Sequence, residues 1–218
     1  MDIQGLKDMK SDKPIFVVFE GLDGSGKSTQ IGLLAQRLRD EGRMVHVTAE
    51  PTVSTTGGLI RDALSGSYPR QTAELAGLFL ADRIAHNVSP ISGIRKMLDA
   101  GMDVICDRYY YSSFAYQGTP ELLSWVMDMN LNCPGILKPD ICVFLDIDPE
   151  SCRDRMGDRT VLEIYEGSSE LLNKTRRRFL SVFESLRGSE NIKLVDAARD
   201  REAVAEDIFK LAAKLAGI

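Results

Sequence analysis

Cysteine is scarce in this sequence of 218 residues, and its four cysteines, Cys106, Cys133, Cys142 and Cys152, show no CxxC spacing. Without such pairs, neither a cysteine-held metal nor a disulfide framework is expected. Cys106 and Cys142 lie in apolar runs, where a thiol behaves as a small core residue. The cytoplasm, where thiols stay reduced, is therefore the predicted location.

Long apolar runs and a basic surplus are also missing. No run approaches the ~20 apolar residues that cross a bilayer, so no membrane partner is expected. The formal net charge of -5 argues against a nucleic-acid partner. Residues 1–13 mix acids and bases without the apolar centre of a secretory signal, and we predict a flexible N-terminal extension there. Residues 14–218, in a chain that is 44% hydrophobic, suit a single domain.

Short apolar runs alternate with longer helical stretches along the chain. Strands are predicted at residues 15–20, 44–48, 103–106, 141–146 and 192–195. Helices are predicted to begin near Lys27, Gly57, Thr72, Glu121, Pro149, Ser168 and Arg201. This alternation predicts an α/β fold with a five-stranded parallel sheet covered by helices on both faces. Ligands of such sheets bind at the carboxyl ends of the strands.

A phosphate-binding loop follows the first predicted strand directly. Residues 21–28 have the sequence GLDGSGKS, a complete GxxxxGK[ST] pattern between a strand and a helix. Its glycines let successive N–H groups face a phosphate, Lys27 reaches the phosphate oxygens as a point charge, and Ser28 ligates Mg²⁺. We expect Lys27 to be an exposed residue that contributes little to the core. The predicted ATP-binding residues are Gly21, Leu22, Asp23, Gly24, Ser25, Gly26, Lys27, Ser28 and Thr29.

This loop predicts a three-layer P-loop NTPase fold, but it identifies only the phosphate donor. Motors, GTPases, transporters and kinases all use such loops. The base-reading NKxD pattern of GTPases does not occur in the sequence. A chain of 218 residues also leaves little room for a coupled motor module. The acceptor has to be inferred from other residues.

Two segments together indicate a family. With GLDGSGKST at 21–29 and DRYYYSSFAYQG at 107–118, the chain resembles the thymidylate kinase family from about residue 15 to its C-terminus. The resemblance implies transfer of the γ-phosphate of ATP to dTMP, giving dTDP and ADP, with Mg²⁺ as cofactor. It also implies a homodimer built on helix faces.

The Asp107-Arg108 pair is predicted to end the third strand, beside the phosphate loop. A carboxylate at this place can hold Mg²⁺ through a water. The guanidinium of Arg108 offers the acceptor phosphate a planar fork that a lysine cannot match. The predicted metal ligands are therefore Ser28 and Asp107, and Arg108 joins Lys27 among the catalytic residues.

Further substrate contacts are implied by the resemblance. Asp23 corresponds to the carboxylate that accepts a hydrogen bond from the deoxyribose 3′-hydroxyl. Phe79 and Arg83 lie four residues apart on one helix face, as do the family's thymine-stacking ring and the arginine that binds the thymine carbonyl edge. Tyr116 matches the tyrosine under the sugar. The weaker substrate-binding candidates are Ser113, Gln117 and Pro51.

A mobile lid is predicted over about residues 153–167. Kinases of this type neutralise the transferred phosphoryl group with an arginine from the phosphate loop or from the lid. The loop of this chain has no arginine. We therefore expect the catalytic arginine among Arg153, Arg155 and Arg159.

Two departures from the family pattern leave alternatives open. Ala49 stands where the family often has an arginine, so one phosphate contact is either missing or supplied by Arg61. The lid sequence is altered at residues 162–166 (LEIYE). The alternatives are a kinase of another pyrimidine monophosphate, a deoxynucleoside kinase with Glu50 as general base, and a nucleotide-binding protein without turnover.

Overall fold

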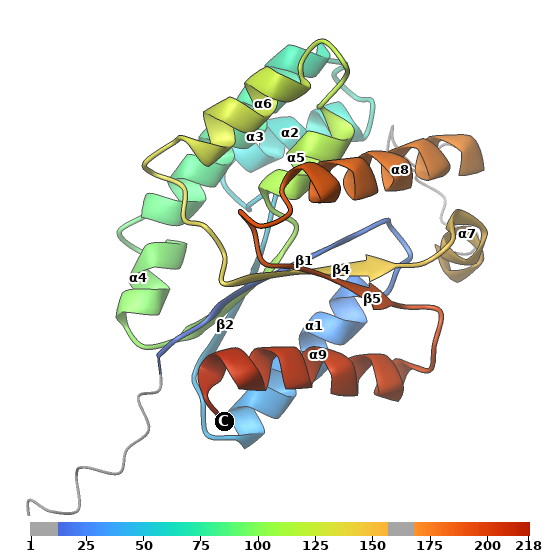
Figure 1. Cartoon of the computed structure of the whole chain (residues 1–218). Coiled ribbons are helices and arrows are strands. Elements are labelled where there is room, and N and C mark those ends of the chain that lie inside the picture. The colour runs from blue at the N-terminus through green and yellow to red at the C-terminus, as the bar shows by residue number, and fades with distance from the viewer. Residues whose placement is uncertain (1–12, 157–167) are drawn as a thin grey trace, which may run out of the picture.

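A five-stranded parallel sheet forms the centre of the computed structural model, which describes residues 13–156 and 168–218 (Figure 1). The strand order is β2-β3-β1-β4-β5. The strands are β1 (Phe16–Gly21), β2 (Val45–Ala49), β3 (Asp103–Asp107), β4 (Ile141–Asp146) and β5 (Ile192–Asp196). The predicted sheet is confirmed. The predicted N-terminal extension lies outside the described residues, except for Lys13.

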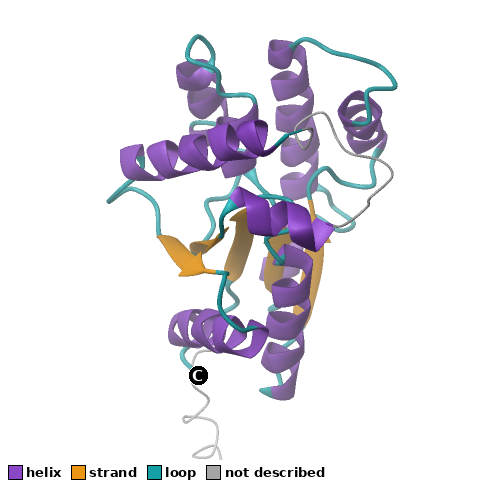
Figure 2. Ribbon diagram, turned by 90° about the vertical axis from the view of Figure 1, so that its right-hand side faces the viewer, coloured by secondary structure: helices purple, strands orange, loops and turns teal. Residues whose placement is uncertain are grey.

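Helices cover both faces of the sheet. They are α1 (Lys27–Asp40), α2 (Thr55–Leu64), α3 (Thr72–Val88), α4 (Ile94–Asp99), α5 (Tyr110–Tyr116), α6 (Leu123–Leu131), α7 (Pro149–Met156), α8 (Ser169–Ser185) and α9 (Arg201–Ala216). Figure 1 shows α1 and α9 under the sheet and α5 and α8 above it, and Figure 2 gives the view at right angles. The predicted three-layer architecture is confirmed.

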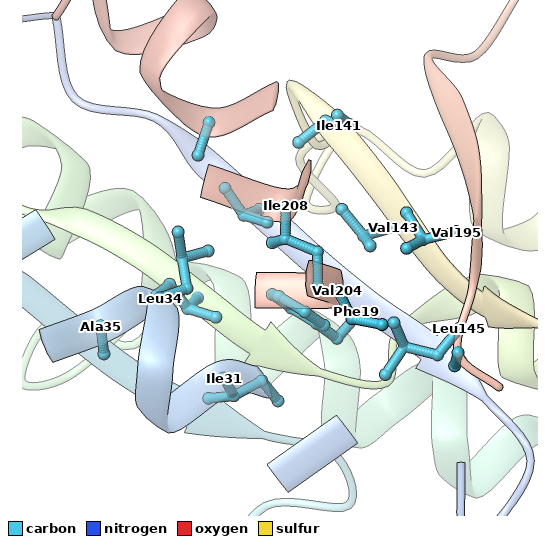
Figure 3. Packing of buried hydrophobic residues seen from close by; sticks show 14 of the residues in the cluster. Phe19, Ile31, Leu34, Ala35, Ile141, Val143, Leu145, Val195, Val204 and Ile208 are labelled. Atoms are coloured by element: carbon cyan, nitrogen blue, oxygen red, sulfur yellow. The ribbon is translucent and has the colours of Figure 1, made fainter. Parts of the chain in front are cut away.

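Strand β1 shows why its sequence is apolar at nearly every position. Val17 and Phe19 belong to the core cluster shared with α1 and α9, whereas Phe16 and Val18 belong to the cluster under α5 and α8. Successive side chains of a strand point to opposite faces, so a strand covered on both faces must be apolar throughout. Figure 3 shows Phe19 packed among residues of α1, β4 and α9.

Two short helices were not predicted from the sequence. All seven residues of α5 are buried, so its sequence has no polar face to reveal a helical period. Helix α4 is only six residues long. The other helices begin within two residues of their predicted starts. For example, α2 begins at Thr55 because the Ser54 side chain accepts a hydrogen bond from Gly57 N.

The carboxyl ends of β1, β2 and β3 lie together. The backbone N–H of Arg108 donates to the carbonyl of Phe19 at 2.9 Å, and that of Glu50 donates to the carbonyl of Asp107 at 3.0 Å. These bonds continue the sheet into its loops. Residues from three distant parts of the sequence thereby meet at one edge.

Two further predictions concern the thiols and the membrane. Cys106 and Cys142 are fully buried in strands, as predicted. None of the helices in the described ranges combines the length and the apolar character that a bilayer crossing requires.

Candidate active site

The phosphate loop lies between β1 and α1 and closely approaches α7. Gly24 has a φ of 82°, and a Cβ at this position would lie 2.3 Å from the carbonyl oxygen of Cys152. Only glycine fits there. Gly26, with a φ of 96°, is the N-cap of α1 and supplies no side-chain cap. The first N–H groups of α1 thus remain available to an anion at the positive end of the helix dipole.

Lys27 lies under the loop, and the expectation of an exposed lysine is wrong. Its side chain is 6% exposed, because the ammonium group donates to the loop carbonyls of Gly21 at 3.0 Å and Leu22 at 2.9 Å. Burial, followed by the charge of Arg108, lowers the pKa of Lys27. A phosphate that reaches Lys27 has to replace these carbonyl partners.

Asp23 lies between two cations. Its Oδ1 accepts a hydrogen bond of 2.6 Å from Nη2 of Arg108 and lies 3.6 Å from Nζ of Lys27. One carboxylate therefore connects the predicted donor-phosphate lysine to the predicted acceptor-phosphate arginine. A single change at Asp23 would alter the charge around both groups.

Arg108 has an uncommon backbone conformation. Its φ is 65°, in the left-handed region that non-glycine residues rarely adopt. Its Nη1 donates to Ser112 Oγ at 3.1 Å and to the hydroxyl of Tyr116 at 3.5 Å. The guanidinium carbon lies 5.4 Å from the centre of the Tyr116 ring. The structure thus brings Arg108, Tyr116 and the phosphate loop together.

Glu20, the penultimate residue of β1, was missed as a site residue. Its carboxylate is fully buried and accepts hydrogen bonds from the backbone N–H groups of Tyr109 and Ser112 and from the Ser112 hydroxyl. Burial raises the pKa of Glu20 to about 7, against the lowering effect of Arg108 and of these hydrogen bonds. The sequence does carry a signal, since Glu20 is the one acidic residue in an otherwise apolar strand.

Arg83 of α3 has a side chain that is only 1% exposed and belongs to a polar network. Its Nε donates to Glu50 at 2.8 Å, its Nη1 to Asn130 at 2.6 Å, and its Nη2 to Ser113 at 3.2 Å. Ser113 is therefore an arginine partner, and Asn130 was not anticipated. Phe79, one helical turn earlier, packs in the apolar cluster between α2 and α3. The remaining substrate candidate on this side, Gln117, is buried at the end of α5.

Glu50 follows β2 and has both carboxylate oxygens engaged. Oε2 accepts from Arg83, and Oε1 lies 3.1 Å from Nδ1 of His86. The other ring nitrogen of His86 lies 2.7 Å from the hydroxyl of Thr48. Glu50 is thus a buried anchor of α3, an arrangement that the Glu-Pro pair in the sequence did not reveal.

The loop after Glu50 is tied to α3 by Asp82. This buried carboxylate accepts hydrogen bonds from the backbone and hydroxyl of Thr52 and from the hydroxyl of Ser54. Arg61, considered as a substitute phosphate ligand, donates to the carbonyls of Thr52 at 2.6 Å and Pro51 at 3.4 Å. It therefore lies at the loop that carries Pro51, with its guanidinium bound to backbone.

The predicted metal ligands satisfy a simple chemical test. Asp107 Oδ1 is buried and has no hydrogen-bond partner, and Ser28 is exposed at the start of α1. Within the described ranges, no group of three or more His, Cys, Asp and Glu side chains could hold a metal. Mg²⁺ commonly takes one or two carboxylates together with waters and phosphate oxygens. Asp107 and Ser28 fit that requirement.

The lid arginines lie on and after α7. Arg153 donates to Ser169 Oγ at 2.9 Å, and Arg155 donates to the carbonyl of Ala197 at 3.1 Å. Arg159, and most of the predicted lid, lie outside the described residues. An arginine that was not predicted, Arg176 of α8, binds both oxygens of Asp146 at 2.6 and 2.8 Å.

A hollow of about 210 Å³ opens beside the phosphate loop. Thr29 and Gln30 of α1 line it together with Arg155 and the segment around Ala197. Ser25 Oγ and Gln30 Oε1 line or adjoin this hollow as buried atoms without a hydrogen-bond partner. Polar atoms in this state are suited to a ligand that supplies the missing partners.

This geometry defines a class of protein. A glycine-rich loop that presents a helix N-terminus and a lysine binds nucleotide phosphates, and a guanidinium facing the same carboxylate as that lysine suits a phosphotransferase. The chain is a P-loop nucleotide phosphotransferase by this criterion.

Comparison with known proteins gives the family. The thymidylate kinase profile matches residues 19–208. A probable thymidylate kinase of Thermococcus kodakarensis is 37% identical over 93% of this chain and 99% of its own length. Those of Pyrococcus horikoshii and Methanothermobacter thermautotrophicus are each 38% identical, over 90% and 94% of this chain and over 94% and 97% of their own lengths. The chain belongs to the thymidylate kinase family, whose reaction is the ATP-dependent phosphorylation of dTMP.

Proposed function

We propose that this chain transfers the γ-phosphate of ATP to dTMP, giving dTDP and ADP, with the site residues in the roles given below. One observation carries this assignment of roles. Asp23 Oδ1 lies 2.6 Å from Arg108 and 3.6 Å from Lys27, so a cation for each of two phosphates faces one carboxylate. Such a site can hold donor and acceptor phosphates side by side.

The donor phosphates bind at the loop. Its N–H groups and the N-terminus of α1 hold the β-phosphate, and the ammonium group of Lys27 moves from the loop carbonyls to the β and γ oxygens. Ser28 and Asp107 would hold Mg²⁺, which would supply further positive charge to the phosphates. The hollow beside Gln30 and Arg155 accommodates the base of ATP.

The acceptor lies on the side of α3 and α5. Its phosphate monoester has a second pKa near ~6 and is mostly dianionic at pH 7, so the enzyme needs no strong general base. Arg108 binds this phosphate, Tyr116 packs under the sugar, and Asp23 accepts the 3′-hydroxyl hydrogen bond. Phe79 stacks on thymine, and Arg83 and Ser113 lie at the polar edge of the base. Pro51 and Gln117 make further contacts with dTMP.

The contacts of Glu50 support dTMP over a nucleoside as the acceptor. A nucleoside kinase needs a carboxylate that takes the proton of a 5′-hydroxyl. Both oxygens of Glu50 already contact Arg83 and His86, and the residue is buried. Glu50 is suited to hold Arg83 and not to accept a substrate proton.

During transfer, negative charge on the γ-phosphoryl group is stabilised by Lys27, Arg108 and a lid arginine. Arg155 is one lid candidate, and it lies close enough to the loop to line the hollow assigned to the base of ATP. Arg153 and Arg159 are the other lid candidates.

We further propose a homodimer. The family resemblance implies contacts through helix faces, and the edge strand β2 offers a further apolar surface to the second copy of the chain. Val47 and Val53 are exposed there, Val53 almost fully, and with Ala85 they line a hollow of about 620 Å³. An uncovered edge strand with apolar neighbours favours association. Sedimentation equilibrium of the wild type and of Val53→Asp tests this: the variant is expected to shift toward monomer.

The cytoplasmic location stays a prediction.

The acceptor is tested by measuring ADP release with dTMP, dUMP, dCMP, AMP and thymidine, each offered separately with ATP and Mg²⁺. We expect the highest kcat/KM with dTMP. A higher value with any other acceptor would overturn the assignment of dTMP while leaving the phosphotransferase class intact.

A further inference from the structure

We propose that Glu20 is a positioning residue, which acts through Ser112 to aim the guanidinium of Arg108 at the acceptor phosphate. This inference rests on the proposed function, because it assumes that Arg108 binds the phosphate of dTMP. Glu20 itself lies under the site and contacts no substrate atom in this account.

Glu20 caps the N-terminus of α5. Its Oε1 accepts from the backbone N–H groups of Tyr109 at 2.9 Å and Ser112 at 3.0 Å. Tyr109 is the N-cap of α5 and makes no side-chain capping bond of its own. The carboxylate of a neighbouring strand therefore satisfies N–H groups that a capping side chain would normally satisfy. It also places negative charge at the positive end of this helix.

Glu20 also sets the direction of the Ser112 hydroxyl proton. Glu20 Oε2 lies 2.6 Å from Ser112 Oγ, and the same hydroxyl oxygen lies 3.1 Å from Nη1 of Arg108. A serine hydroxyl has one proton to donate and two lone pairs. Above its pKa of about 7, Glu20 is ionised and only accepts, so the Ser112 proton points to Glu20 and a lone pair faces Arg108. The carboxylate thus makes Ser112 an acceptor for the guanidinium.

The backbone of Arg108 has a φ of 65°, a conformation that requires support from its surroundings. The N–H of Arg108 donates to Phe19 O, and the N–H of the next residue, Tyr109, donates to Glu20. Consecutive residues of β1 therefore hold the two peptide groups on either side of the Arg108 α-carbon. Every hydrogen bond of Glu20 to a described residue goes to Tyr109 or Ser112, at the start of α5 directly after Arg108. A buried carboxylate that binds the segment 109–112 supports the position of the side chain just before it, that of Arg108.

The test is a double-mutant cycle on dTMP binding, measured at pH 8, where Glu20 is ionised. Glu20→Gln keeps an acceptor for the two N–H groups, but its NH₂ group donates to Ser112 Oγ. The Ser112 proton is then no longer held by position 20, and one of the two lone pairs that could face the guanidinium is occupied. We expect the Kd and KM for dTMP to rise about tenfold and the KM for ATP to stay within twofold. In an Arg108→Ala background, Glu20→Gln is expected to change the Kd for dTMP less than twofold, because the group that it aims is gone.

A matched control distinguishes positioning from general support of the fold. Asp103→Asn changes another buried carboxylate, at the opposite edge of the sheet, where it binds Arg43 and the backbone of Ile15. It is expected to lower the melting temperature while both KM values stay within twofold. An equal loss from Glu20→Gln in the wild-type and Arg108→Ala backgrounds, or equal rises in both KM values, would overturn the proposal.

A second variant serves if Glu20→Gln fails to fold. Ser112→Ala removes only the hydroxyl between Glu20 and Arg108, and it should raise the Kd for dTMP severalfold when Arg108 is present and less than twofold when it is not. Equal effects in both backgrounds would also overturn the proposal. A wild type that neither binds nor phosphorylates dTMP overturns the proposed function and this inference with it. A wild type that does both, without coupling of Glu20 or Ser112 to Arg108, overturns the inference alone.

Discussion

Buried charged groups have different surroundings at the two ends of the parallel strands, here called the amino edge and the carboxyl edge of the sheet. At the amino edge, Asp103 accepts a hydrogen bond from the backbone of Ile15 and a two-pronged ion pair from Arg43, at 2.6 and 2.7 Å. Asp140 accepts from the backbone of Phe16 at 2.7 Å in the same region. The polar groups of these carboxylates meet fixed partners within the protein.

At the carboxyl edge, several groups lack such partners or sit in costly conformations. Among the described residues, Asp107 Oδ1 and Ser25 Oγ are buried without a hydrogen-bond partner. Lys27 is held by carbonyls of its own loop and by the Asp23 carboxylate at 3.6 Å, and Arg108 has a positive φ. Buried polar atoms and strained backbone cost free energy unless a ligand or a rigid neighbourhood compensates them. The amino edge therefore serves stability, and the carboxyl edge is prepared for ligands.

The largest expected effect on turnover comes from Lys27→Ala. Removing a charge that stabilises the transferred phosphoryl group should lower kcat by roughly 10²–10³-fold or more. The fold should persist, because the partners of the ammonium group, the carbonyls of Gly21 and Leu22 and the carboxylate of Asp23, all belong to the loop itself. Steady-state kinetics and thermal unfolding measure the two properties. A variant that melts as the wild type does and keeps its turnover would disprove the donor site.

At the amino edge, Asp103→Asn should have the opposite profile. It leaves Arg43 without its buried anion, and breaking such a pair costs about 3 kcal/mol or more. Urea unfolding should show this loss, whereas kcat should stay within twofold because the substitution lies at the far edge of the sheet. A large fall in kcat with unchanged stability would break the distinction between the two edges.

The pKa of Glu20 predicts a pH dependence of stability at the carboxyl edge. The folded-state pKa is about 7, against an ordinary value of 4.5, so between these values the folded protein binds more protons than the unfolded chain. Stability from this group is therefore present below about pH 4.5 and is lost as pH rises to about 7, by roughly 3 kcal/mol. Urea unfolding at pH 5 and pH 8 should show a larger loss for the wild type than for Glu20→Gln. Equal losses would mean that Glu20 titrates normally.

A smaller effect is expected for Arg108→Lys, which keeps the charge but loses the planar fork. Hydrogen bonds to charged groups contribute ~1.5–3 kcal/mol, so kcat/KM for dTMP should fall about tenfold or more. The contact with Asp23 at 2.6 Å should weaken as well. Titration of dTMP at saturating ATP measures this. Activity within twofold of the wild type would remove Arg108 from the acceptor site.

The sequence predicted the parts of this molecule whose pattern is local. Strands buried on both faces are continuous apolar runs, and the loop at 21–28 has fixed glycine spacing. Helix α5 escaped prediction because burial on all sides removes the helical period from the sequence of Tyr110–Tyr116. The exposed position expected for Lys27 was wrong because loop carbonyls, which no side-chain pattern reveals, satisfy its charge.

The supporting partners of the site could not be predicted for a related reason. Glu20 meets Ser112 across 92 positions of sequence, and Glu50 meets Arg83 across 33. Arg176 likewise finds Asp146 only once α8 packs near the end of β4. These contacts depend on how the helices and strands pack together, and a single sequence does not reveal that packing.

The central claim is that the site at the carboxyl edge catalyses phosphorylation of dTMP by aligning the two substrates and neutralising phosphate charge, without a carboxylate that acts as a base. Turnover of Glu50→Gln with dTMP and with thymidine tests it most directly, since Glu50 is the side chain that a nucleoside kinase would need as its base. We predict that the folded variant keeps a substantial share of wild-type kcat with dTMP, and that thymidine is a poor acceptor for both proteins. Loss of all turnover in Glu50→Gln, together with faster phosphorylation of thymidine than of dTMP by the wild type, would contradict the account.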